Sequence, residues 1–194
     1  MPKSIHLKNE VGIPSDINVV IDGKRVKIQG PLGVIEKDFS HLHNIIIEKG
    51  DDNKIIIESW FPLKKEQSLV NTVASHLKNA FIGVQKGYRY KMKIVYAHFP
   101  MSLKVDEKNN IVIIENFLGS RDKKYAKILP GVKVKVQKDD VIIEGIDIDA
   151  VGQTAANIHL AAKLRGKRRL SPHGREGGPG ILDGIYLYAK ENIK

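Results

Sequence analysis

The chain has 194 residues, and its 32 lysines and arginines against 22 aspartates and glutamates give a formal net charge of +10. Its composition, with 42% hydrophobic and 28% charged residues, is that of a globular protein and excludes an intrinsically disordered chain. Because the chain contains no cysteine, disulfides, cysteine-ligated metal centres and thiol catalysis are excluded as well.

The first half of the chain predicts several strands followed by one helix. Asp22-Gly23 is a hairpin signal between two β-branched segments. Apolar residues then recur at every fourth position from Leu69 to Phe81, which predicts an amphipathic helix over residues 64–80 that packs on a sheet. The expected strands are residues 17–21, 25–29, 34–39, 45–48 and 54–59.

The second half predicts the same order of elements. Asp149 stands where a helix N-cap is expected, and a second helix is expected over residues 151–164, followed by an exit strand. The expected strands before it are residues 91–98, 102–105, 111–115, 132–137 and 141–144.

The two halves also align with each other. A shift of 86 residues without gaps matches nine identical pairs and repeats the order of element types. Several strands before one helix are typical of an α+β fold. We therefore expect a tandem duplication of one α+β domain, each copy a largely antiparallel sheet packed against one helix, divided into residues 1–83 and 84–194. In the first copy the identical residues are Ile28, Leu32, Gly33, Lys37, Ile56, Ile57, Glu58, Gln67 and Asn71.

The positive charge is concentrated in the second copy. Residues 1–83 carry 11 basic and 10 acidic residues, whereas residues 84–194 carry 21 and 12. The run from 163 to 175 holds six basic residues and no acid. One or two cations would suit a solvated helix end, but six repel each other and favour a polyanion such as nucleic acid. The six are Lys163, Arg165, Lys167, Arg168, Arg169 and Arg175.

Residues 171–180 hold four glycines and two prolines, which exclude a helix or a central strand. The segment, which includes His173, is either a plain surface loop or an extension of the 163–194 region that lies on phosphates and ribose. It matches no nucleotide-binding glycine motif.

Residues 84–93 interleave tyrosines with cations. On a strand, Tyr88 and Tyr90 point to one face, and Arg89, Lys91 and Lys93 point to the other. Two interpretations stay open here. Either the tyrosines stack on bases while the cations reach phosphates, or the tyrosines form a core face opposite a solvated basic face.

Catalysis and membrane binding have weaker support. Glu144, Asp147 and Asp149 suggest, as an alternative function, a free-standing RNA-processing nuclease that depends on metal ions, although aspartate is also expected at a turn before a helix. His41 and His43 lack an obvious third metal ligand. A membrane partner is not expected, because the longest uncharged stretch has 13 residues and the basic run has only two large apolar residues.

Several blocks, in order along nearly the whole chain, resemble one large-subunit ribosomal protein family, numbered six in bacteria and nine in eukaryotes. The last blocks resemble its eukaryotic and archaeal branch. The segment 171–180 is longer than that pattern suggests. The blocks are residues 26–33 (Val-Lys-Ile-Gln-Gly-Pro-Leu-Gly), 36–39, 87–92 (Gly-Tyr-Arg-Tyr-Lys-Met), 95–100 (Val-Tyr-Ala-His-Phe-Pro), 115–119, 129–132 and 182–186 (Leu-Asp-Gly-Ile-Tyr).

The resemblance implies a structural protein without cofactor, metal site or catalytic residue, located on cytoplasmic ribosomes and assembled in the nucleolus if the source is eukaryotic. It implies binding to ribosomal RNA near the sarcin–ricin loop, beside neighbouring ribosomal proteins and close to docking translational GTPases. The implied RNA contacts are Lys163, Arg165, Lys167, Arg168 and Arg169, with residues 88–93 as a second candidate.

Overall fold

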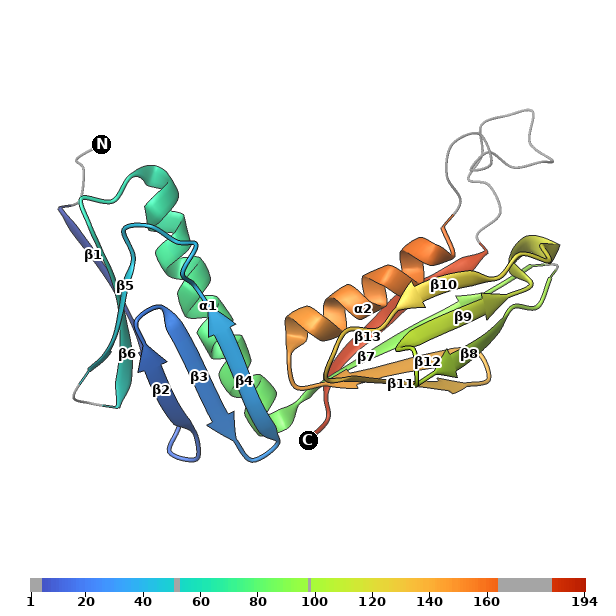
Figure 1. Cartoon of the computed structure of the whole chain (residues 1–194), viewed down its shortest axis with the longest axis horizontal. Coiled ribbons are helices and arrows are strands. Elements are labelled where there is room, and N and C mark those ends of the chain that lie inside the picture. The colour runs from blue at the N-terminus through green and yellow to red at the C-terminus, as the bar shows by residue number, and fades with distance from the viewer. Residues whose placement is uncertain (1–4, 51–52, 98, 164–182) are drawn as a thin grey trace. The chain divides into compact units, whose positions relative to one another are not determined.

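A computed structural model describes residues 5–50, 53–97, 99–163 and 183–194, and the chain divides into two compact units, Met1–Gly87 and Tyr88–Lys194 (Figure 1). We call them unit 1 and unit 2. The boundary expected at Gly83 lies inside a helix that continues to Lys86, so the division falls at the glycine that ends this helix.

Unit 1 consists of one helix, α1 (Lys64–Lys86), and two three-stranded sheets with the strand orders β1-β6-β5 and β2-β3-β4. All strand pairs in it are antiparallel. The strands are β1 (His6–Gly12), β2 (Asn18–Asp22), β3 (Arg25–Gly30), β4 (Gly33–Asp38), β5 (Ile46–Gly50) and β6 (Lys54–Trp60).

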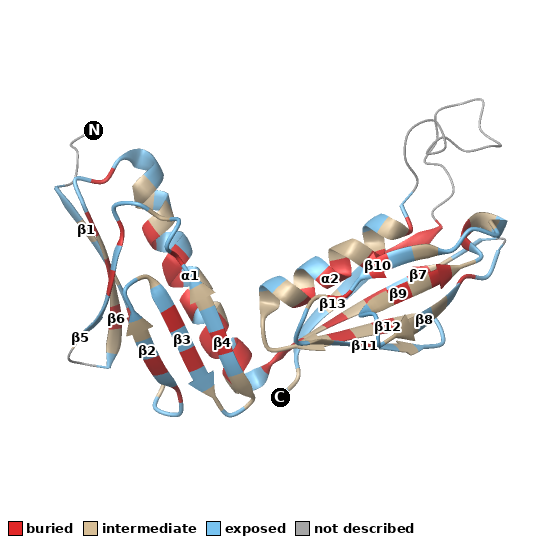
Figure 2. Ribbon diagram, in the orientation of Figure 1, coloured by how far each residue is buried: buried red, intermediate tan, exposed pale blue. Residues whose placement is uncertain are grey.

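The core of unit 1 follows from the two periodicities of the sequence. Buried positions recur along α1 and alternate along β3, where Val26 and Ile28 are fully buried (Figure 2). The helix and the sheet approach closely at Gly30, because a Cβ atom built there would lie 2.7 Å from Val84 Cγ2. The expected helical stripe therefore packs on the strands, and it continues beyond Phe81 to Val84.

Unit 2 contains α2 (Ile148–Ala161), a four-stranded sheet of order β11-β12-β7-β13, a three-stranded sheet of order β10-β9-β8, and the 3-10 turn η1 (Phe117–Gly119). Its strands are also antiparallel. They are β7 (Tyr88–Val95), β8 (Ser102–Asp106), β9 (Ile111–Glu115), β10 (Lys124–Lys127), β11 (Val132–Gln137), β12 (Asp140–Gly145) and β13 (Gly184–Asn192).

The strand orders confirm the tandem duplication. The order β7-β12-β11 repeats β1-β6-β5, and β8-β9-β10 repeats β2-β3-β4. Each copy has two sheets where one was expected. Unit 2 also has an addition, because β13 pairs with the edge of β7, whereas β1 pairs only with β6 among the described residues. The C-terminal strand thus completes a sheet that is one strand narrower in unit 1.

Several boundaries differ from those expected. The sequence did not predict β1 or β10, since β1 exposes His6, Lys8 and Glu10 on one face and has few β-branched residues. The N-cap of α2 is Asp147 and not Asp149, because Asp147 Oδ1 accepts a hydrogen bond from the Asp149 amide at 3.1 Å. Within the described part of the chain, neither helix has the length and hydropathy needed to span a bilayer.

Candidate nucleic-acid interface

Strand β7 places its tyrosines in the core of unit 2. Tyr88 and Tyr90 are 8% and 7% exposed and pack in one cluster with Met92 and Ile94. Burial raises the pKa of both phenols above the usual value. Rings enclosed in this way are poorly placed to stack on bases, so of the two interpretations of this strand the structure favours the core face.

The opposite face of β7 carries cations that are already paired. Arg89 Nε lies 2.7 Å from Glu144 Oε1, and Lys91 Nζ lies 2.9 Å from Glu191 Oε2. Lys93 Nζ lies 3.4 Å from Asp140 Oδ1. The partners come from β12 and β13, the two strands beside β7.

These pairs reduce the value of the β7 face as a phosphate-binding surface. Burial acts to raise the pKa of Glu144, but hydrogen bonds and charge attraction from Arg89 and Lys135 outweigh it and hold that pKa below its usual range. A phosphate would have to compete with carboxylates that already neutralise the cations. A face with alternating charges is therefore weaker for a polyanion than the sequence pattern of β7 indicated.

The basic run begins where α2 ends. Lys163 follows the C-cap residue Ala162 and is exposed. The remaining expected contacts lie outside the described residues. They are Arg165, Lys167, Arg168, Arg169, His173 and Arg175.

Two hydrogen bonds fasten the described residues on either side of the basic run. The His159 ring, in the last turn of α2, donates through Nδ1 to the carbonyl oxygen of Ile185 at 2.8 Å. Asp183 is 5% exposed, and its Oδ1 accepts from the Ala97 amide at 2.9 Å. The end of α2 is therefore held to the start of β13, and the residue before β13 is held to the segment that follows β7.

Exposed aromatic side chains occur on β13 beside this junction. Tyr186 lies 5.4 Å from the His159 ring, centroid to centroid, and Tyr188 is 57% exposed at a bulge between Leu187 and Ala189. The ring of Tyr186 lies over Gly184, where a Cβ atom would come within 3.1 Å of it. Residues 182–186 stood out in the sequence only by resemblance, and His159, Asp183 and Tyr188 were not among the expected contacts, since their roles depend on contacts between distant segments.

The acidic residues considered for catalysis have structural roles. Asp147 caps α2, and Glu144 is paired with Arg89 and Lys135. His41 and His43 are exposed in the loop before β5. Over the described ranges, no three histidine, aspartate or glutamate side chains come together in a way that could hold a metal ion.

Comparison with known proteins gives consistent matches. The model of the family "Ribosomal protein L6" matches residues 13–87 and 99–168. A large ribosomal subunit protein uL6 of Staphylothermus marinus is 49% identical over 189 residues, covering 97% of each chain. The corresponding proteins of Aeropyrum pernix and Sulfurisphaera tokodaii are 45% and 47% identical, covering 100% of both chains in the first case and 98% and 96% in the second.

Proposed function

Because the chain belongs to the ribosomal protein L6 family, in its archaeal and eukaryotic branch, we propose that unit 2 binds large-subunit ribosomal RNA near the sarcin–ricin loop. The protein is a structural component of the large ribosomal subunit and not an enzyme. It works on ribosomes in the cytoplasm, with ribosomal RNA and other ribosomal proteins as its partners.

The observation that carries the proposal is the fastened junction between α2 and β13. The His159–Ile185 and Asp183–Ala97 hydrogen bonds hold in place the described residues that flank the basic run, the end of α2 and the start of β13. Fixed flanks reduce the entropy lost when the run binds phosphates. We propose Lys163 and the run's other cations as the phosphate contacts, in preference to the paired cations of β7. These other cations are Arg165, Lys167, Arg168, Arg169 and Arg175, and His173 of the same run is a further proposed contact.

We further propose that base stacking, where it occurs, uses Tyr186 and Tyr188 of β13. Both rings are exposed and lie on the strand that follows the basic run. Exposed aromatic rings beside cations suit single-stranded or looped RNA. Since translational GTPases dock near the sarcin–ricin loop, the same placement brings these factors close to unit 2.

A salt titration with an RNA fragment that contains the sarcin–ricin loop tests the phosphate contacts. If five or six phosphates are contacted, the logarithm of the association constant should fall against log salt with a slope of about −4 to −5. Arg168→Gln with Arg169→Gln should reduce that slope by about two. The control is Lys91→Gln with Lys93→Gln, which changes paired cations and should leave the slope unaltered.

Two results would contradict the proposal. A slope near zero, or an equal loss of slope in the control, would mean that the basic run is not the phosphate-binding surface. Equal affinity for a fragment of the same length from a distant part of the same RNA would remove the assignment to the sarcin–ricin region.

Tyr188→Ala should weaken binding without changing the salt slope, because a stacking contact releases no counterions.

A further inference from the structure

Unit 1 exposes a group of large apolar side chains at one end, which we call the apolar end patch: Ile5, Trp60, Phe61 and Leu63. Their exposed fractions are 65%, 52%, 73% and 66%. They lie where β1 starts, β6 ends and α1 begins, at the end of unit 1 close to the N-terminus (Figure 1). Single exposed apolar residues are common in soluble proteins, but several large ones gathered at one end of a unit point to an interaction surface.

The patch has a defined geometry. The Phe61 amide donates a hydrogen bond to the Ile5 carbonyl at 2.8 Å, which continues the β1–β6 ladder and sets Phe61 beside Ile5. The His6 ring stacks on Trp60 with centroids 4.2 Å apart and an interplanar angle of 24°. The apolar side chains are thus presented on an ordered backbone.

Two of the four residues are unfavourable for the local backbone structure in which they lie. Phe61 has a φ of 49°, in the left-handed region that favours glycine or asparagine. Leu63 occupies the N-cap of α1 and makes no side-chain capping hydrogen bond, where serine, threonine or aspartate would be preferred. Residues that oppose local preference and also expose apolar surface are expected at functional sites.

The charge around the patch is positive. Lys64 and Lys65 follow it directly, are exposed, and have no ion pair with a carboxylate of the described residues. Glu66 is engaged, since its carboxylate accepts from the Leu63 amide at 2.7 Å and from Asn44 at 2.9 Å. The nearby cations thus lack acidic partners of their own.

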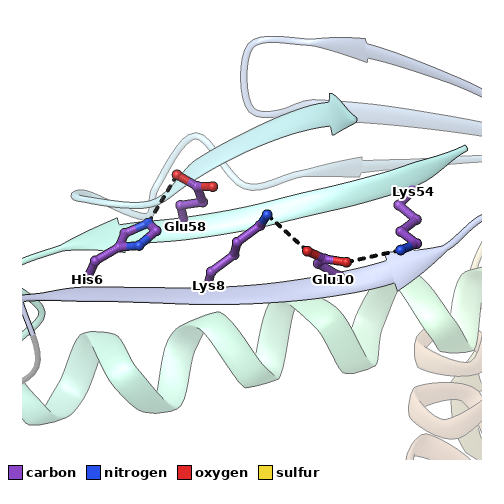
Figure 3. A network of polar contacts seen from close by, with 5 residues as sticks. All are labelled: His6, Lys8, Glu10, Lys54 and Glu58. Atoms are coloured by element: carbon purple, nitrogen blue, oxygen red, sulfur yellow. Dashed lines mark hydrogen bonds and ion pairs between the residues drawn. The ribbon is translucent and has the colours of Figure 1, made fainter. Parts of the chain in front are cut away.

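The neighbouring face of β1 and β6 is neutralised internally (Figure 3). His6 Nε2 lies 3.2 Å from Glu58 Oε2. Glu10 lies between Lys8, at 2.9 Å, and Lys54, at 3.3 Å. The carboxylates beside the patch are therefore occupied, and the attraction available to a partner comes from Lys64 and Lys65.

We propose that the apolar end patch docks an acidic amphipathic segment of another protein. Its apolar residues would cover Phe61 and Leu63, and its carboxylates would meet the two lysines. RNA fits less well, because Ile5 and Leu63 cannot stack as aromatic rings do and His6 already covers one face of Trp60. A second copy of the chain fits less well too, since it would bring Lys64 and Lys65 against the same two lysines of the other copy.

Trp60 is the only tryptophan in the sequence, so its fluorescence reports on the patch directly. The full chain is titrated with a synthetic peptide that has leucine and phenylalanine on one helical face and aspartate and glutamate on the other. We expect a saturable blue shift that weakens with salt. A peptide with the same apolar face and lysines in place of the acids should bind at least tenfold more weakly.

Two variants separate binding from folding. Phe61→Gly places a glycine where the backbone is left-handed, and Leu63→Ser supplies an N-cap side chain, so both variants should keep or raise the thermal midpoint of unfolding. Both should also lower the affinity for the acidic peptide about tenfold or more, because each removes an apolar contact. The matched control is Tyr125→Ala, which removes an equally exposed aromatic ring from unit 2 and should leave peptide affinity unchanged.

Several results would overturn this proposal. They are the absence of a fluorescence change, equal binding of the lysine peptide, and wild-type affinity in both patch variants. A single-stranded RNA that shifts Trp60 emission where the acidic peptide does not would assign the patch to RNA instead. None of these outcomes bears on the basic run, because the salt titration of RNA binding tests unit 2 separately.

Discussion

At the scale of single residues, Leu63 shows how one position can limit the stability of a helix. It is followed three residues later by Glu66, whose carboxylate already accepts a hydrogen bond from the Leu63 amide. This is one half of a capping box, and the other half requires a serine or threonine oxygen that leucine lacks.

Leu63→Ser should complete the capping box and raise the free energy of unfolding by about 1 kcal/mol, since the serine oxygen can accept an amide of the first turn. Urea unfolding followed by circular dichroism measures the change. The same replacement at Leu187, which is exposed in β13 and caps no helix, should bring no gain. A destabilised Leu63→Ser chain would mean that the leucine packs on its own unit.

The pair Arg89–Glu144 makes stability depend on pH. Its charge attraction holds the folded-state pKa of Glu144 below the usual value, although burial opposes this. A lowered folded pKa contributes stability that is fully present above the unfolded value, about 4.3, and is lost as the pH falls through the folded value. The protein is therefore expected to weaken on acidification below about pH 4.3.

Arg89→Met should cost about 1–2 kcal/mol at pH 7, because it leaves the carboxylate of Glu144, 17% exposed, with only the more distant Lys135. The difference from the wild type should be smaller at pH 3 than at pH 7, because acidification protonates a growing fraction of the carboxyl and the charge attraction is lost with it. Urea midpoints at the two pH values measure it. Lys93→Met breaks a more exposed pair and should change stability by less than about 0.5 kcal/mol; a pH-independent cost for Arg89→Met would contradict the account.

At the scale of elements, the contact of α1 with β3 depends on a missing side chain. Gly30 ends β3 directly beneath Val84, and the Leu32 amide donates to the Val84 carbonyl at 3.0 Å. A Cβ atom at Gly30 would lie 2.7 Å from Val84 Cγ2, closer than packed side chains tolerate. The last turn of α1 is therefore fitted to a glycine.

Gly30→Ala should destabilise unit 1 by about 1–3 kcal/mol, because helix and sheet must move apart to admit the methyl group. Thermal and urea unfolding measure the loss. Gly12→Ala is the matched control, since a Cβ atom at that strand end meets nothing within 4 Å. If both variants lost the same stability, the close approach would not be the cause.

At the scale of the whole molecule, each unit carries its own helix, sheets and core. Residues 1–87 should therefore fold alone with a cooperative unfolding transition. A fragment of residues 1–83 should be clearly less stable, because it lacks Val84, which is fully buried against Gly30. Circular dichroism during heating compares the two fragments. Equal stability would place the boundary at Gly83, as expected from the sequence.

Much of the architecture follows from the sequence by itself. Helix α1 follows from apolar periodicity and α2 from a capping aspartate near its start, and β9 and β11 match the expected strands, because these signals are local. Strand β1 was not expected, because one of its faces consists of the polar residues His6, Lys8 and Glu10. It forms by pairing with β6, which lies far away in the sequence. The duplication and the family are visible as well, because motif order and an internal repeat are properties of the sequence alone.

Only the tertiary structure decided which candidate residues are free to bind. The alternation of β7 puts its tyrosines and its cations on opposite faces, but it does not say which face is buried. Packing against α2 and β12 buries the face with Tyr88 and Tyr90. Two cations of β7, Arg89 and Lys91, form ion pairs with Glu144 and Glu191, which lie far away in the sequence. A sequence records what each residue offers locally, whereas burial and ion pairing depend on residues that only folding brings together.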